Sequence, residues 1–158
     1  MRPYREIKLT KNAVALVDEE DFDILSRYKW SLGFNGYPQR GTWDGEKSTP
    51  RSMHRDILES IDGKYIDHIN GDKLDNRRHN LRLCSTSQNG ANAKISVRNK
   101  TGFKGVDYRV DLKKYRARVG KNNAGFYKTA KEAALAYDSL ARKVYGDFAK
   151  TNKELGLI

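Results

Sequence analysis

Side chains that could do chemistry gather most densely between residues 65 and 83, which read Tyr-Ile-Asp-His-Ile-Asn-Gly-Asp-Lys-Leu-Asp-Asn-Arg-Arg-His-Asn-Leu-Arg-Leu. The start of this segment is typical of a strand, with His68 and Asn70 on one side and Asp67 on the other. Because neighbouring residues of a strand project in different directions, Asp67 can hold a metal ion while His68 reaches a water molecule beside it. The pair could therefore combine a bound cation with an imidazole that handles protons.

Two familiar metal sites do not explain this cluster. An EF-hand needs Asp or Asn at its third position, Gly at its sixth and Glu at its twelfth. Counted from Asp67, Ile69 is third, Gly71 is fifth and Arg78 is twelfth. A structural zinc site needs four Cys or His ligands, and Cys84 with the three histidines of the chain would supply them only by accident. The EF-hand is excluded, and a plain polar turn with a surface histidine remains as the structural alternative.

Several predicted elements flank the cluster. A helix is expected over Met53–Ser60, with its apolar residues on one face, and another begins at Ser85 or Thr86 and carries Asn89 in its second turn. The N-terminal region reads as short strands and turns. Its predicted elements are strands at 6–10, 13–17 and 28–32, a helix-like stretch at 22–27, and a hairpin turn at Asn35-Gly36 leading into 37–40. The aromatic residues expected in its core are Tyr28, Trp30 and Tyr37.

The polar positions of the cluster recur at a fixed spacing. Asp67-His68 is followed by Asn-Gly-Asp-Lys-Leu-Asp-Asn, then by Asn80-Leu-Arg and by Ser-Gln-Asn89. This pattern resembles the HNH endonuclease family, in the form found in phage and intron-associated homing enzymes. Met53-His54-Arg55 and the N-terminal Leu-Thr…Val-Asp-Glu-Glu-Asp…Tyr-Lys-Trp segment also look like that subgroup, so the resemblance covers residues 5–95.

The resemblance implies a ββα-metal (His-Me finger) core that hydrolyses phosphodiester bonds of DNA, leaving a 3′ hydroxyl and a 5′ phosphate. By position, Asp67 and Asn89 would hold one divalent metal ion. His68 would be the general base that takes a proton from the attacking water, and Asn80 would brace the loop. The sequence is thus of a His-Asn-Asn type, and His79 matches no position of the motif.

The chemistry of these groups agrees with those roles. A carboxylate and an amide oxygen suit Mg²⁺, or another divalent cation such as Mn²⁺, and a single carboxylate favours one metal ion over two. An imidazole with an ordinary pKa of about 6.5 can be neutral and basic at working pH. Four nearby arginines are candidate phosphate contacts: Arg55, Arg77, Arg78 and Arg82.

Charge divides the chain of 158 residues unevenly. Its formal net charge is +11, and residues 96–158 carry +9 of it, with 15 Lys and Arg against 6 Asp and Glu. The length allows one ordinary domain or two very small ones. The sequence has one cysteine and lacks a long apolar run or a signal peptide, so we expect a cytoplasmic protein of a bacterial or phage-infected host cell that is not secreted. The charge points to a polyanion as its partner.

The basic region reads as three strands and a helix. Strands are expected at 103–110, 114–120 and 125–128, and a helix at Ala130–Tyr145 that Thr129 caps and Gly146 ends. The expected apolar stripe of this helix consists of Ala133, Ala136, Tyr137, Leu140 and Val144. In the second strand, Arg116 and Arg118 alternate with apolar residues, which would present cations on the outer face of a sheet that fits the DNA major groove.

This region also resembles a known family. Phe-Lys-Gly-Val…Lys-Tyr-Arg-Ala-Arg-Val…Glu-Ala-Ala-Leu-Ala-Tyr-Asp…Ala-Lys-Thr-Asn, over residues 103–152, is similar to the Apetala-two/ethylene-response-factor (AP2/ERF) DNA-binding domain. By position, the residues that fall where that family contacts DNA are Lys104, Asp107, Arg109, Arg118, Lys121 and Asn123. Tyr115 stands where the family has Trp, and Ala124-Gly125 where it has Leu-Gly, so a base preference does not carry over.

Together these patterns predict an α+β protein with a ββα-metal nuclease core, an N-terminal small β region, and a three-stranded antiparallel sheet packed on one helix. The predicted nuclease domain spans 1–95, with a β-rich region at 1–52 and the core at 53–95. A linker at 96–102 and a DNA-binding domain at 103–158 follow it. We expect a monomeric, metal-dependent homing endonuclease that acts on double-stranded DNA, with no membrane partner and no small-molecule cofactor. A non-catalytic, sequence-specific DNA-binding regulator and an RNA-binding or RNA-cleaving protein remain alternatives.

Overall fold

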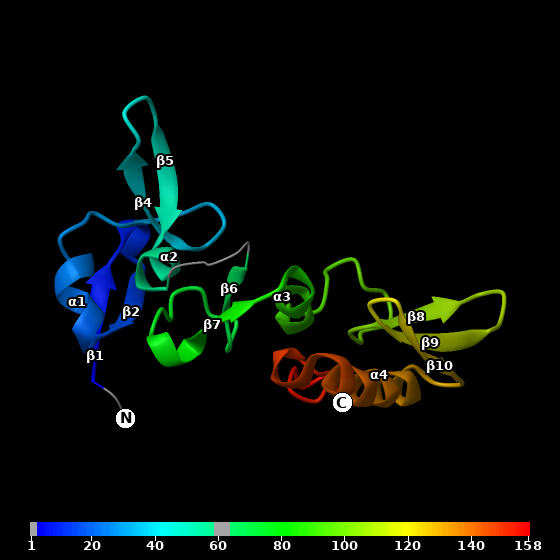
Figure 1. Cartoon of the computed structure of the whole chain (residues 1–158). Coiled ribbons are helices and arrows are strands. Elements are labelled where there is room, and N and C mark those ends of the chain that lie inside the picture. Colours follow the sequence, from blue (N-terminus) through cyan, green and yellow to red (C-terminus); the bar gives the residue numbers. More distant parts are fainter. Residues whose placement is uncertain (1–2, 59–63) are drawn as a thin grey trace. The chain divides into compact units, whose positions relative to one another are not determined.

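The computed structural model describes residues 3–58 and 64–158. It divides the chain into two compact units, Met1–Ser85 and Thr86–Ile158, each described by itself below (Figure 1). Small antiparallel sheets and short helices make up both units, which confirms a mixed class of α and β structure. Among the described residues, no helix combines the length and the apolar character needed to cross a membrane.

The first unit contains three small antiparallel sheets, β1-β2, β3-β4-β5 and β6-β7. Its strands are β1 (Tyr4–Lys8), β2 (Val14–Asp18), β3 (Ser31–Leu32), β4 (Pro38–Trp43), β5 (Ser48–Ser52), β6 (Tyr65–His68) and β7 (Leu81–Cys84). Its helices are η1 (Thr10–Asn12), α1 (Glu19–Leu25), α2 (Met53–Ile57) and η2 (Arg78–Asn80). One buried core joins the sheets, and its members include Ile7, Val17, Leu25, Trp30, Met53, Ile66 and Leu81. Because this core reaches both β2 and β6, the N-terminal strands support the strand that carries Asp67 and His68.

A second link ties the N-terminal hairpin to the polar loop between β6 and β7. The N–H of Leu16 donates to the carbonyl of Leu74 and the N–H of Asn76 donates to the carbonyl of Leu16, each at 2.8 Å. These two bonds form a parallel bridge between Leu16 and Asp75. The centre of the loop is therefore fixed by backbone pairing with β2.

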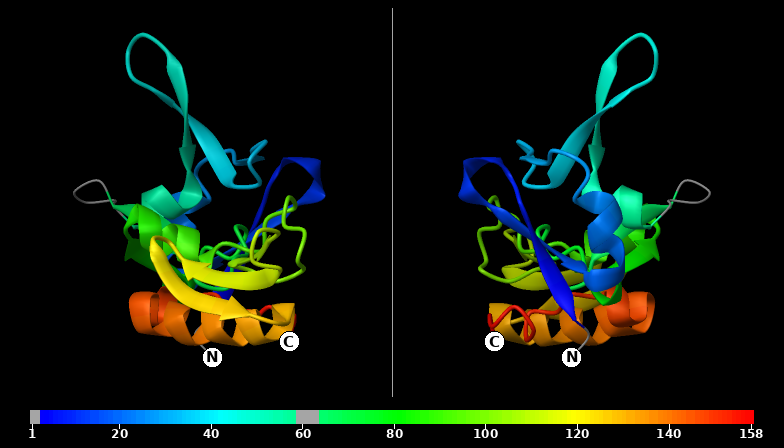
Figure 2. Two further views of the ribbon diagram at one scale, coloured as in Figure 1. Left: turned by 90° about the vertical axis from the view of Figure 1, so that its right-hand side faces the viewer. Right: turned by 90° about the vertical axis from the view of Figure 1, so that its left-hand side faces the viewer.

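The second unit packs a three-stranded antiparallel sheet on one long helix. Its elements are α3 (Thr86–Asn92), β8 (Val106–Arg109), β9 (Lys114–Val119), β10 (Asn122–Tyr127), α4 (Ala130–Tyr145) and η3 (Gly146–Phe148). The sheet order is β10-β9-β8, and the sheet lies along α4 (Figures 1 and 2). Small residues at the interface allow a close approach: a Cβ on Gly105, whose φ is +72°, would lie 2.0 Å from the ring of Tyr137. This position therefore requires glycine.

The structure corrects several expectations about single elements. The prediction omitted β5 and the long β4-β5 hairpin, which projects beyond the other elements of the first unit (Figure 2). Trp30 is buried as predicted, but Tyr28 is exposed. The buried face of α4 consists of Ala133, Ala134, Tyr137 and Ala141, whereas Val144 is exposed. The expected helix at 53–60 ends at Ile57, and residues 59 and 60 lie outside the described residues.

The predicted boundary between the two domains differs from the boundary between the two compact units of the structure. The compact units meet after Ser85, before the expected end of the nuclease domain at residue 95, because α3 packs on α4 and η3. The strands β6 and β7 and the helix α3 follow one another in the order that a ββα motif needs. Their arrangement as a ββα-metal core stays a prediction.

Candidate active site and nucleic-acid interface

Asp67 and His68 end the short strand β6, where both side chains are buried. Antiparallel pairing places Asp67 opposite Arg82 and His68 opposite Leu81 on β7. The guanidinium of Arg82 donates from Nε and Nη2 to Oδ2 of Asp67, at 3.1 and 3.0 Å. The cross-strand arginine thus fixes the orientation of the carboxylate and balances its charge.

Asn80 connects the two ends of the loop that follows β6. Its Nδ2 donates to Oδ1 of Asn70 at 3.0 Å and to the carbonyl of Asp75 at 2.8 Å, while its Oδ1 accepts the N–H of Asn70 at 3.0 Å. The side chain is buried, so these bonds satisfy polar groups that water does not reach. The bonds of Asn80 hold the loop closed next to His68.

The imidazole of His68 is enclosed by side chains from distant segments. Its Nε2 lies 3.3 Å from Oδ1 of Asn76, and its ring centroid lies 5.7 Å from that of Tyr37 and 5.3 Å from that of His54. Burial is the largest influence on the pKa of His68 and lowers it, although Asn76 and the carboxylate of Asp67 act in the opposite direction. The ring is therefore neutral at physiological pH and can accept a proton.

His54 is a second buried histidine at this place, and the sequence motif assigns it no catalytic role. It is 7% exposed, and its Nδ1 is a buried atom with no hydrogen-bond partner within the described residues. Burial, and to a smaller extent the neighbouring His68, lower its pKa to about 4. The signal in the sequence was the resemblance of Met53-His54-Arg55 to the HNH subgroup. Two neutral imidazole rings therefore lie next to each other at this place.

Three of the four arginines predicted as phosphate contacts hold carboxylates instead. Arg82 binds Asp67, as described, and the guanidinium groups of Arg77 and Arg78 form two-fold hydrogen bonds with Asp75 and Asp21. The fourth, Arg55 on α2, is exposed. It lines a polar groove together with Thr42, Thr49, Pro50, Arg51 and Ser52. In the first unit, Arg55 is the member of this set that is best placed to meet DNA.

Asn89, the predicted second metal ligand, lies on α3 in the second unit. Its role as a ligand stays a prediction. Among the described residues, no three His, Cys, Asp or Glu side chains gather in a geometry that could hold a metal ion. The carboxylate of Asp67 is a ligand that suits a hard cation, which would keep water and phosphate oxygens among its other ligands.

The outer face of β8 and β9 carries the charged residues predicted to contact DNA. Arg116 donates from Nε and Nη2 to the carboxylate of Asp107 at 3.1 and 3.0 Å, and Arg118 lies 3.8 Å from the same carboxylate. Arg109 is paired with Asp111 in the turn that follows β8. Arg118 keeps 59% of its side chain exposed, so it is the most accessible guanidinium of this group.

The remaining three predicted contacts differ from one another. Lys121 is exposed, and the Oδ1 of Asn123 accepts the N–H of Gly125 at 3.0 Å at a bulge in β10. Lys104 points into the unit, where its ammonium donates to the carbonyls of Ala91 and Ala93 at 2.6 Å and of Lys150 at 3.1 Å. Burial lowers its pKa to about 8. These bonds use the donors of Lys104 inside the unit, so its predicted DNA contact is not supported.

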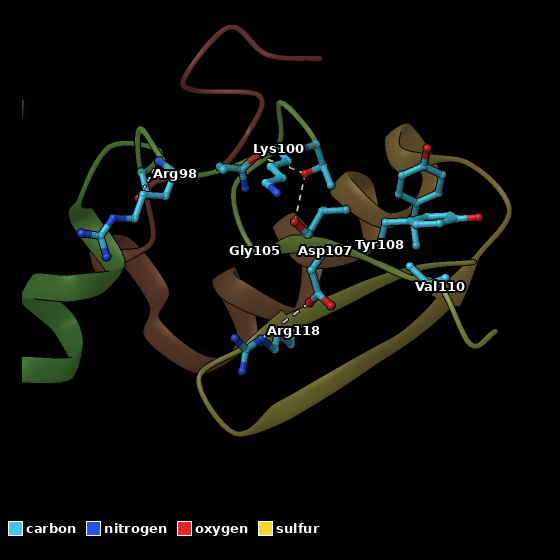
Figure 3. Close-up of a pocket in the computed structure, with 12 residues that line it drawn as sticks. Arg98, Lys100, Gly105, Asp107, Tyr108, Val110 and Arg118 are labelled. Carbon is cyan, nitrogen blue, oxygen red and sulfur yellow. Dashed lines mark hydrogen bonds and ion pairs between the residues drawn. The ribbon is translucent and has the colours of Figure 1, made fainter. Parts of the chain in front are cut away.

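A cleft of about 820 Å³ borders this sheet (Figure 3). It lies between the segment 96–101 and the strands β8 and β9, and its cationic lining residues are Arg98, Lys100 and Arg118. Asn99 shapes the segment, because its Oδ1 accepts the N–H groups of Thr101 and Gly102 at 2.9 Å. The expected linker is therefore a folded turn, and it brings two further cations to the sheet.

Comparison with known proteins adds a further observation. The family model described as an HNH endonuclease matches residues 59–91, a range that contains Asp67, His68, Asn80 and Asn89. The chain is 35% identical over 153 residues to the "Uncharacterized HNH endonuclease L560" of Acanthamoeba polyphaga mimivirus, and the match covers 90% of this chain and 76% of that relative. The chain belongs to the HNH endonuclease family.

Family membership makes the protein a DNA-cleaving hydrolase, and HNH endonucleases generally use a divalent metal ion. The HNH endonuclease is also 31% identical over 91 residues to "Protein 3.8" of Escherichia phage T7, covering 56% of this chain and 75% of that protein. No solved structure matches the chain. The family match ends at residue 91, so the AP2/ERF resemblance of the second unit has no support from it.

Proposed function

We propose that this HNH endonuclease is a metal-dependent homing enzyme in which His68 is the general base and Asp67 and Asn89 hold one divalent metal ion. The observation that carries the proposal is His68 itself, a buried imidazole with a lowered pKa next to the carboxylate of Asp67. A base must be unprotonated before it can act, and the surroundings of His68 keep it so.

Each residue of the proposed site has a separate role in hydrolysis. His68 takes a proton from the attacking water at the imidazole nitrogen that carries the lone pair. When bound, a divalent metal ion neutralises the charge of the scissile phosphate and stabilises the leaving 3′ oxygen. Asp67 is held in one orientation by Arg82, and Asn80 keeps the loop closed around the base. The products would carry a 3′ hydroxyl and a 5′ phosphate.

Residues 103–158, within the second unit, are proposed as an AP2/ERF-like domain that binds duplex DNA, and the segment 96–102 would separate them from the nuclease domain (1–95). Its support is a three-stranded sheet on one helix with a cationic outer face, in the half of the chain that carries most of the positive charge. The proposed contacts are Asp107, Arg109, Arg116, Arg118, Lys121 and Asn123 on the sheet, with Arg98 and Lys100 at the cleft and Arg55 in the nuclease domain. Cationic side chains that neutralise DNA phosphates would give this domain the affinity for DNA that a small nuclease core lacks.

Cleavage of supercoiled plasmid tests this function. The full chain is incubated with Mg²⁺, with EDTA, and as the variant His68→Ala, and each sample is also tested for a shift of duplex DNA on a gel. We expect cleavage by the wild type with Mg²⁺ only, and a loss of about 10²- to 10⁴-fold in the variant while DNA binding is retained. His79→Ala is the matched control, because His79 is exposed and outside the motif. Cleavage by His68→Ala at the wild-type rate would contradict the proposal.

The strand specificity follows from the number of active sites. A monomer with one site would nick one strand, so mapping both strands at stoichiometric enzyme should give a cut on one of them. Binding of DNA without cleavage of plasmid or of DNA from the source genome would instead identify a DNA-binding regulator.

A further inference from the structure

Asn76 is a fully buried side chain that the proposed mechanism has not used. It lies at the centre of the loop between β6 and β7 and is 0% exposed. Its amide makes two contacts: Oδ1 lies 3.3 Å from Nε2 of His68, and Nδ2 donates to the carbonyl of Lys73 at 3.1 Å. A buried amide with both ends engaged has one favourable orientation.

The contact with Lys73 decides which end of the amide faces the histidine. If the amide were turned over, Oδ1 would face the carbonyl oxygen of Lys73, and two acceptors would repel each other. The oxygen of Asn76 therefore faces Nε2 of His68. An oxygen accepts a hydrogen bond, so this contact requires the proton of a neutral imidazole to be on Nε2. The lone pair is then on Nδ1.

The position of Asn76 is set by the N-terminal hairpin. Its N–H donates to the carbonyl of Leu16 on β2 at 2.8 Å, and the N–H of Leu16 in turn donates to the carbonyl of Leu74 at 2.8 Å. The same core that buries β2 also buries the start of β6. Both partners of the contact between Asn76 and His68 are thus attached to one rigid framework.

We propose that Asn76 is a positioning residue that holds His68 in the Nε2–H tautomer, so that Nδ1 is the atom that receives the proton of the attacking water. This inference rests on the proposed role of His68 as the base. It also gives the N-terminal hairpin a function, because β2 places the amide that orients the base. A neutral histidine with the wrong tautomer would present an N–H to the water and could not accept its proton.

Nuclear magnetic resonance of the ¹⁵N-labelled full chain measures the tautomer directly, at a pH above about 7.5 where the imidazoles are neutral. The chain has three histidines, so the variants His54→Phe and His79→Gln assign the signals. We expect wild-type His68 in the Nε2–H form, with a ring proton that exchanges slowly with water. In Asn76→Leu, which keeps the branching of the side chain at Cγ and removes the acceptor, we expect fast exchange of that proton and a mixture of tautomers.

Kinetic measurements distinguish a positioning role of Asn76 from a role in stabilising the fold. In Asn76→Leu we expect kcat for DNA cleavage to fall about 10- to 100-fold with KM nearly unchanged. Asn76→Asp keeps an oxygen acceptor toward Nε2 and should retain the Nε2–H tautomer and more of kcat than Asn76→Leu. Its second oxygen replaces the donor to the carbonyl of Lys73, so this variant should have a lower melting temperature than the wild type. Leu74→Ala is the matched control: it loosens the packing of the same segment on the core, so it should lower the melting temperature and leave the tautomer unchanged.

Two results would overturn the inference: wild-type His68 in the Nδ1–H form, or Asn76→Leu with an unchanged tautomer, proton exchange and kcat. Failure of the proposed function is a separate result. If His68→Ala cleaves DNA normally, His68 is not the base, yet the resonance experiment still reports whether Asn76 sets its tautomer.

Discussion

The buried His54 makes the stability of the first unit depend on pH in a way that can be calculated. In the unfolded chain a histidine has a pKa of about 6.5, and in the folded unit burial lowers the pKa of His54 to about 4. The unfolded state therefore binds a proton more readily than the folded state. The contribution of His54 to the free energy of unfolding is therefore fully present above a pH of about 6.5. It is lost as the pH falls toward the pKa of the folded state, which is about 4.

The size of the effect follows from the difference between the two pKa values. A difference of one unit between the two pKa values corresponds to about 1.4 kcal/mol. Protonation of His54 should therefore lower the free energy of unfolding by about 3 kcal/mol as the pH falls from about 6.5 to about 4. That loss is a large fraction of the roughly 5–15 kcal/mol that holds a typical domain folded. In His54→Phe the ring remains against its neighbours but cannot take up a proton, so this contribution to the pH dependence should disappear.

Urea unfolding followed by tryptophan fluorescence measures this effect in the first unit alone. The two tryptophans of the chain, Trp30 and Trp43, both lie in that unit, and Trp30 is buried. Carboxylates such as Asp75, whose pKa Arg77 lowers, also lose stability in acid, but they are present in both proteins and cancel in the difference. Parallel stability curves for wild type and His54→Phe between about pH 6.5 and pH 4 would show that His54 does not contribute to the pH dependence of stability.

Three further predictions concern packing and charge. Gly105→Ala forces a Cβ against Tyr137 at a positive φ, so it should destabilise the second unit by about 3 kcal/mol, measured by circular dichroism during urea unfolding. Lys104→Met removes three internal hydrogen bonds, so it should lower the melting temperature without changing the salt dependence of DNA binding. Arg118→Met should instead make that salt dependence weaker, reducing the slope of the logarithm of the DNA-binding constant against the logarithm of the salt concentration by about one. Arg82→Gln releases the carboxylate at the site and should reduce cleavage about 10- to 100-fold at unchanged DNA affinity, measured in single-turnover assays.

The helix α4 was predictable because its signals are local. Its bounds are those expected from the sequence. Thr129 is the N-cap as expected: its side chain accepts the N–H of Glu132 at 3.2 Å, and Glu132 accepts the N–H of Thr129 at 3.1 Å, which together form a capping box. Most other strands of both units were located from similarly local patterns, with ends that shift by a few residues.

The β4-β5 hairpin was missed because long-range contacts hold it. Its strands are polar and contain Gly and Pro, so the sequence carries no alternating apolar pattern there. Arg40 and Arg51, one on each strand, both bind Asp56 on α2. Such an ion-pair cluster joins residues that a local pattern does not connect.

The candidate site was predictable only where its residues follow one motif. Asp67, His68 and Asn80 lie within one short stretch, but Tyr37, His54 and Asn76 meet His68 through the tertiary fold. Their order along the chain gives no indication that the three surround one ring. Likewise, the sequence does not distinguish a lysine that binds carbonyls inside the protein, as Lys104 does, from one that binds phosphate.

The most direct test of the central claim is chemical rescue of His68→Gly. We predict that this variant binds DNA, cleaves it at least about 100-fold more slowly than the wild type, and recovers some of the rate when free imidazole is added as the base. Cleavage at the wild-type rate without imidazole would contradict the role of His68 as the general base.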